Sequence, residues 1–104
     1  MKLVVLKAVE DLMSRYEGKA FELHMGALIG FDIVSTDEMV VAECFATVTA
    51  FNNQKIKKDS EKLMQLSDDV DRYIYFYAKD DSKDKIAAFT EKYEKITFIR
   101  IESF

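Results

Sequence analysis

The sequence is poor in the residues that break or cross-link a chain: it contains no proline, three glycines and one cysteine in 104 residues. The absence of proline and of glycine clusters excludes a flexible linker, a low-complexity tract and a glycine-rich phosphate-binding loop. A single cysteine, Cys44, excludes an internal disulfide and a cysteine-based zinc site. It also fits a reducing compartment, so we expect a cytoplasmic location.

Long hydrophobic runs and an excess of positive charge are also missing. No apolar stretch approaches the about 20 residues that cross a bilayer, and Glu10 and Asp11 interrupt the apolar start MKLVVLKAVEDL before it reaches the length of a signal-peptide core. The 15 basic and 19 acidic residues give a net charge of −4. Because such a field repels phosphates, we expect no membrane partner, and nucleic acid only through a local basic patch or a partner chain.

The length and the 49% content of hydrophobic residues predict one folded domain over residues 1–104. Its first element is predicted to be an amphipathic helix over residues 3–17, followed by Gly18 as a helix-ending residue. The alternative for residues 3–6 is a strand, since Val4 and Val5 are β-branched. The apolar stripe that indicates the helix has spacings of three and four and consists of Leu3, Leu6, Val9, Met13 and Tyr16.

Three strands are predicted to follow, because the apolar period changes to two. They cover residues 20–25, 28–34 and 39–48, and the polar turn residues 35–38 separate the second from the third. Strands in such quick succession predict an antiparallel meander. The first strand has Glu22 and His24 on one face, and we expect His24 to be a surface or structural histidine rather than a general base.

The second half of the chain alternates helices with strands. Asn52 is placed to cap a helix that continues through Leu63 and Leu66, with Ile56 completing a hydrophobic staple. Residues 73–78 are apolar on both faces and predict a central strand, and residues 97–101 predict the last strand. The helix between these two strands has an apolar stripe that consists of Ile86, Phe89, Tyr93 and Ile96.

The predicted order is therefore helix, strand, strand, strand, helix, strand, helix, strand. Because a strand–helix–strand unit joins parallel neighbours, residues 73–78 are expected to lie parallel to residues 39–48. The fold class that follows is α/β, a three-layer α/β/α domain with a mixed five-stranded sheet.

Two acidic residues lie on the same face of the predicted hairpin. A turn centred on residues 36–37 pairs Asp32 with Val41 and Gly30 with Glu43, which makes Asp32 and Glu43 diagonal neighbours about 7–8 Å apart at the backbone. The other residues of that face are apolar: Leu28, Val34, Val41 and Phe45. Carboxylates in apolar surroundings need a partner. The partner is either a shared metal ion, or a lysine or backbone group that has no chemical role.

The segments FDIV, VVAECFAT and NNQKIKKD, together with the order of elements, resemble the PD-(D/E)xK nuclease superfamily and its restriction endonuclease-like fold. The resemblance implies that Asp32 and Glu43 are ligands of a divalent metal, Mg²⁺, that activates water against a phosphodiester. The lysine expected two residues after the glutamate is replaced by Phe45. In some members this lysine comes from the following helix, which implies Lys55 as the catalytic cation here.

The lysines of this predicted helix have a second interpretation. Lys55, Lys58 and Lys62 follow one stripe at spacings of three and four, and with Lys57 they form a cluster interleaved with acidic residues. Such a cluster is most often a solvated helix face, and a phosphate-contacting surface is the alternative.

Three hypotheses for function are open from the sequence. The first is a divergent PD-(D/E)xK-like domain, non-catalytic or weakly active, that serves as an interaction module in a nucleic-acid-related process with a protein partner or a second copy of the chain. The second is an active Mg²⁺-dependent nuclease that uses Asp32, Glu43 and Lys55; without activity no cofactor is expected. The third is an unrelated small ligand-binding α/β domain. Phe45 favours the first, because losing one charge-stabilising donor typically costs about 100- to 1,000-fold in rate.

Overall fold

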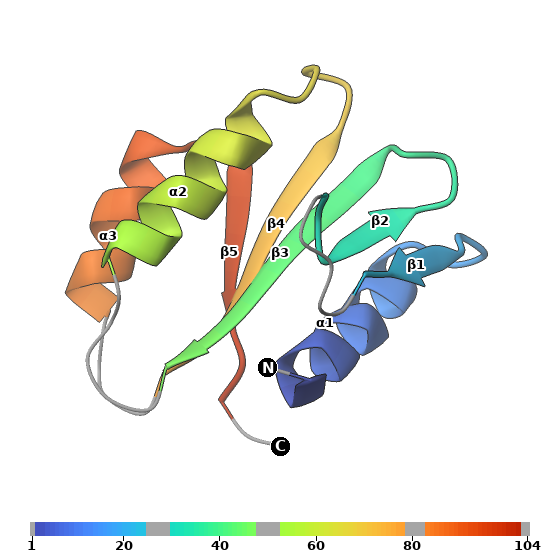
Figure 1. Ribbon diagram of the computed structural model, residues 1–104, viewed down its shortest axis with the longest axis horizontal. Coiled ribbons are helices and arrows are strands. Elements are labelled where there is room, and N and C mark those ends of the chain that lie inside the picture. The colour runs from blue at the N-terminus through green and yellow to red at the C-terminus, as the bar shows by residue number, and fades with distance from the viewer. Residues whose placement is uncertain (1, 25–29, 48–52, 79–82, 103–104) are drawn as a thin grey trace.

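The chain has an α/β fold (Figure 1), and a computed structural model describes residues 2–24, 30–47, 53–78 and 83–102. Helices and strands occur in the predicted order. They are α1 (Lys2–Arg15), β1 (Phe21–Leu23), β2 (Ile33–Ser35), β3 (Val40–Thr47), α2 (Asn53–Met64), β4 (Asp71–Ala78), α3 (Lys83–Lys92) and β5 (Ile96–Arg100).

The strands form one five-stranded sheet in the order β1-β2-β3-β4-β5. β1, β2 and β3 are antiparallel neighbours, whereas β4 runs parallel to β3 and β5 runs parallel to β4. α1 packs against one face of the sheet, and α2 and α3 pack against the other (Figure 1). The three-layer fold, the mixed sheet and the parallel pairing of β3 with β4 are therefore confirmed.

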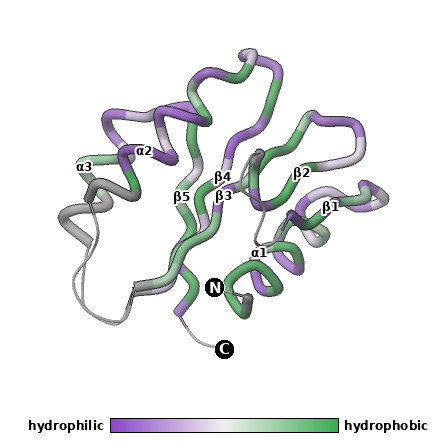
Figure 2. The backbone as a smooth tube through the Cα atoms, viewed as in Figure 1, coloured by the Kyte–Doolittle hydropathy of each residue, from purple (hydrophilic) through white to green (hydrophobic). Residues whose placement is uncertain are grey.

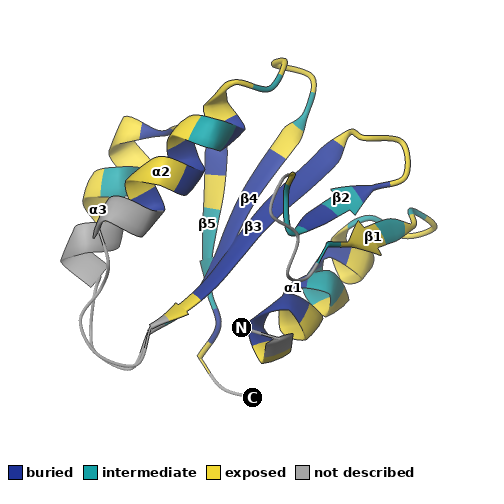
Figure 3. Cartoon of the chain, viewed as in Figure 1, coloured by how far each residue is buried: buried dark blue, intermediate teal, exposed yellow. Residues whose placement is uncertain are grey.

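β3 and β4 form the centre of the core because helices cover both of their faces. On the α1 side, Tyr75 of β4 packs in one cluster with Cys44 of β3. On the other side, Ile74 and Phe45 pack in a second cluster with residues of α2. Figure 3 shows both strands buried over most of their length, and Figure 2 shows that hydrophilic residues dominate the outer surface of α2. The prediction of a doubly covered strand at residues 73–78 is confirmed.

The first helix forms as predicted, but only Val9 and Tyr16 of its predicted apolar stripe pack against the core. Leu3, Leu6 and Met13 are 56%, 44% and 57% exposed. The side chains that pack on the sheet are Val4, Val5, Ala8 and Leu12. Tyr73 and Tyr75 occupy this side of the sheet, and three of the four packed residues, Val4, Val5 and Ala8, are shorter than leucine, which allows the helix axis to approach it.

The hairpin register also differs from the prediction. Val34 pairs with Val41 and Ile33 with Ala42, which is a shift of two residues. The loop is responsible: Ser35 Oγ accepts hydrogen bonds from the backbone N–H groups of Met39 and Val40, at 3.1 and 2.9 Å, which leaves residues 36–39 as the turn. Because side chains alternate with a period of two, the shift leaves every residue on its predicted face.

Several predicted bounds are corrected or lie outside the described residues. Of the predicted strand 28–34, β2 includes only Ile33 and Val34; it extends one residue further, to Ser35, and residues 25–29 are not described. Asn52, the predicted cap of α2, also lies outside the described residues, and α2 ends at Met64 rather than continuing to Leu66. Ile96 begins β5 instead of extending the stripe of α3, because the helix already ends at Lys92.

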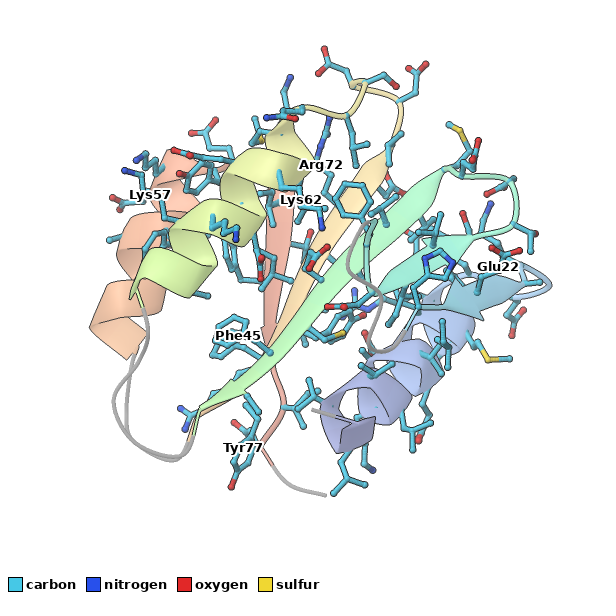
Figure 4. All side chains as sticks on the ribbon, viewed as in Figure 1. Glu22, Phe45, Lys57, Lys62, Arg72 and Tyr77 are labelled. Carbon is cyan, nitrogen blue, oxygen red and sulfur yellow. The ribbon has the colours of Figure 1, made fainter. Side chains whose placement is uncertain are left out.

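Arg72, at the start of β4, holds the C-terminal end of α2 against the sheet (Figure 4). Its side chain is buried, and its Nε donates to the carbonyl of Leu63 at 2.8 Å. Its Nη2 donates to the carbonyls of Leu66 and Ser67, at 2.5 and 2.7 Å. These carbonyls lie at the C-terminal end of α2 and just beyond it, and those of Leu63 and Ser67 also accept the backbone N–H groups of Leu66 and Val70. The guanidinium therefore places a cation at the negative end of the helix dipole.

A second polar contact fixes α1 on its side of the sheet. The buried Tyr75 hydroxyl donates to Asp11 Oδ2 at 2.5 Å, and Arg15 Nε donates to the same oxygen at 2.7 Å. Burial and the bond to Asp11 raise the pKa of Tyr75, so the hydroxyl stays a donor throughout the physiological range. The contact is therefore a helix-to-sheet tether rather than a titrating site.

Candidate functional site

Glu43 is a buried carboxylate in the middle of the central strand β3. It pairs with Ile74 of β4 and shares its face with Val41 and Phe45, the face on which α2 packs. Its side chain is 5% exposed. A carboxylate at this depth requires a hydrogen-bonding or charged partner.

Lys62 of α2 is that partner (Figure 4). Its Nζ lies 3.0 Å from Glu43 Oε1, and it also donates to the carbonyl oxygen of Gly30. The same ammonium lies 4.6 Å from the ring centroid of Phe31, within cation–π range. Lys62 therefore joins three parts of the chain: α2, β3 and the segment that leads into β2.

Asp32 lies immediately before β2, on the same face of the sheet as Glu43. If the register of Ile33 with Ala42 is continued by one residue, Asp32 stands opposite Glu43. The half-buried Asp32 accepts a hydrogen bond at Oδ2 from the backbone N–H of Cys44, 2.8 Å away. The two acidic residues thus come together, as the alternation of side chains requires, and each has a partner within the protein.

A third carboxylate, Asp59, adds to the negative charge around Glu43. It belongs to α2, three residues before Lys62, and it is buried. Burial and the charges of Asp32 and Asp59 raise the pKa of Glu43 from 4.5 to about 7, against the opposing effect of Lys62. Glu43 therefore takes up a proton near neutral pH, unlike an ordinary glutamate.

Lys62 and Asp59 are the site residues that the sequence analysis did not single out. Lys62 belongs to the stripe of Lys55 and Lys58, and the stripe alone does not show which lysine reaches β3. Asp59 follows the core residue Ile56 by three positions, a spacing that indicates the inward face of a helix. The side chain of Lys55, the predicted cation, lies outside the described residues.

Phe45 is part of the core rather than of the polar site. It is 4% exposed, and its ring stacks on Phe76 with centroids 5.9 Å apart. It fills the inter-strand space and offers no charge to the carboxylates. The position at which the resemblance implies a lysine is therefore used for packing.

In this arrangement each of the two carboxylates already has a partner within the protein. The ammonium of Lys62 binds Glu43, and one oxygen of Asp32 accepts the amide of Cys44. Within the described ranges, no group of three or more His, Cys, Asp or Glu side chains is arranged to hold a metal ion. The arrangement is that of an acid–lysine cluster, named here for Asp32, Glu43, Asp59 and Lys62.

Two clefts, each of about 540 Å³, lie beside α2 or the segment that follows it. The first lies on the outer surface of α2 and is lined by Lys57, Lys58, Glu61, Lys62 and Gln65. The second has an apolar floor beside β2 and the end of α2, formed by Phe31, Val34, Val41, Leu66 and Val70. His24 and Glu22 line the rim of the second cleft, and their side chains lie 3.5 Å apart.

Comparison of this chain with protein-family models, with curated proteins and with solved structures finds no match. None of the described helices combines the length and the apolar character needed to cross a bilayer. The interpretation of the site therefore depends on its own geometry.

Proposed function

We propose that this chain is a non-catalytic α/β domain of PD-(D/E)xK type that acts as an interaction module in a nucleic-acid-related process. The observation that carries the proposal is the ion pair of Lys62 Nζ with Glu43 Oε1, at 3.0 Å, with the Glu43 side chain only 5% exposed. A lysine in this position places a cation on Glu43, where the resemblance implies a metal ion.

A further property argues against catalysis by the acid–lysine cluster. The ammonium of Lys62 already binds Glu43 and the Gly30 carbonyl. To stabilise a developing phosphoryl charge it would have to break both contacts.

The surface that supports an interaction role is the outer side of α2. Lys57 and Lys58 are exposed there and line the lysine-rich cleft with Gln65. This is a local basic patch on a chain of net charge −4, and a patch of this kind is required if phosphates are to be bound against an unfavourable overall field.

Cleavage and binding assays test the proposal separately. Supercoiled and single-stranded DNA are incubated with the protein in Mg²⁺ and in Mn²⁺, beside the double variant Asp32→Ala with Glu43→Ala. We expect no metal-dependent cleavage by either protein. Cleavage by the unaltered protein that the double variant lacks would establish a nuclease instead.

Binding is measured by fluorescence anisotropy with labelled single- and double-stranded oligonucleotides at low salt. The double variant Lys57→Ala with Lys58→Ala should bind more weakly and with a smaller salt dependence. Each phosphate contact adds about one to the slope of log affinity against log salt concentration. The matched control is Lys92→Ala with Lys95→Ala, which removes the same charge from the region of α3. If the two double variants lost affinity equally, the outer side of α2 would not be a specific binding surface.

The active Mg²⁺-dependent nuclease is retained as a second candidate because of one observation: a lysine from α2 does reach Glu43, although it is Lys62. The cleavage assay above decides between the two. An unrelated small-molecule-binding domain is the third candidate, and the observation that favours it is the apolar floor of the cleft beside Phe31. A ligand screen by thermal shift, with Phe31→Ala as the control, tests it.

A further inference from the structure

The outer face of α1 carries an apolar stripe that the fold does not cover. Leu3, Leu6 and Met13 are 56%, 44% and 57% exposed, while the opposite face of the same helix is packed on the sheet. Figures 2 and 3 show α1 with hydrophobic and exposed residues on its outer turns. Single exposed apolar residues are ordinary, but several along one helix face indicate an interaction surface.

The spacing of the stripe is that of a helix-pairing seam. Leu3, Leu6, Glu10 and Met13 follow one another at steps of three, four and three, the repeat that keeps one edge of a helix facing a partner helix. Three of the four positions are apolar. The fourth, Glu10, is a single charged residue within the seam, and such a residue selects the alignment of the two helices.

The charges along α1 favour a second copy of the same helix in the opposite direction. Lys7 and Glu10 are both exposed, with Lys7 nearer the N-terminus. In an antiparallel pair, Leu3 can lie beside Met13 of the partner subunit. Glu10 then lies beside Leu6 of the partner subunit and near Lys7 of the partner subunit. A parallel pair would instead set Lys7 against lysine and Glu10 against glutamate.

We propose that two copies of this chain associate through α1, as an antiparallel, two-fold symmetric helix pair. The contact is isologous, so each attractive contact of the outer face occurs twice. A lipid surface is disfavoured as the occupant, because the apolar face of a membrane-lying helix enters the bilayer and the seam of α1 contains the charged residue Glu10. The proposal is independent of the acid–lysine cluster, which lies on the opposite side of the sheet.

Sedimentation velocity over a concentration series tests the proposal with the full chain. The unaltered protein should show a reversible monomer–dimer equilibrium. Leu6→Asp should weaken dimerisation at least tenfold, because it places a carboxylate beside Glu10 of the partner subunit. The matched control is Met64→Asp on α2, an apolar residue 37% exposed on the other side of the sheet, which should leave the equilibrium unchanged.

A charge exchange tests the alignment without burying a new charge. Lys7→Glu and Glu10→Lys should each weaken the dimer several-fold, and the variant with both changes should restore it. Far-UV circular dichroism checks that every variant is folded, as expected for substitutions at exposed positions.

A protein that stays monomeric at all concentrations would overturn the proposal. So would a dimer that Leu6→Asp leaves intact, or a charge exchange that fails to restore association. Binding of the monomer to anionic vesicles, lost in Leu6→Asp, would replace it with a membrane surface.

Discussion

The most informative prediction concerns the pH dependence of stability that Glu43 produces. In the folded chain its pKa is about 7, against 4.5 for an ordinary glutamate. The folded state therefore binds the proton more tightly than the unfolded state. The stabilisation from protonated Glu43 is fully present below pH 4.5 and is lost as the pH rises through 7. Each tenfold change in proton affinity corresponds to about 1.4 kcal/mol. Ionisation of Glu43 therefore lowers the free energy of unfolding by about 3 kcal/mol at pH 8.

Glu43→Gln removes this cost because the amide keeps an oxygen for Lys62 and does not ionise. The variant should unfold with a free energy about 2–3 kcal/mol higher than the unaltered protein at pH 8, and only about 1 kcal/mol higher at pH 5. Urea titrations followed by circular dichroism at several pH values measure the difference. Comparing the two proteins at each pH cancels the titration of all other groups.

The control is Glu61→Gln, which removes the same charge from an exposed position of α2 and should change stability by less than about 0.5 kcal/mol at either pH. A variant Glu43→Gln that is equally or less stable than the unaltered protein at pH 8 would refute the reasoning. Such a result would mean that the ion pair with Lys62 more than offsets the burial of the charge.

Three further changes test the contacts around the sheet by the same urea titrations. Lys62→Met should lower the free energy of unfolding by about 2 kcal/mol at pH 8 and much less at pH 5, since only ionised Glu43 then lacks its cation; an equal loss at both pH values would contradict this. Arg72→Lys should cost about 2–4 kcal/mol, because one ammonium cannot replace a guanidinium that binds several carbonyls, and a loss under 1 kcal/mol would argue against its capping role. Tyr75→Phe should cost about 1 kcal/mol through the lost hydrogen bond to Asp11, and unchanged stability would show that the tether contributes nothing.

The type and order of the elements follow from local patterns in the sequence. The spacing of apolar residues changes from three or four to two after α1, which separates this helix from the antiparallel strands that follow. The apolar residues on both faces of β4 indicate a strand that is covered on both sides. The same alternation places Asp32 and Glu43 on one face for any pairing register of β2 with β3 that differs by an even number of residues. This is why the pairing of the two acidic residues survives an error of two residues in the register.

Periodicity within single segments therefore predicts the set of elements and the face on which the carboxylates lie. Tertiary packing selects which face of α1 is buried, since Leu3 and Val4 are both apolar and the choice depends on the tyrosines beneath the helix. It also decides that the cation of the cluster is Lys62, because the position of α2 over β3 is set by packing between distant segments and not by the spacing of lysines along the helix.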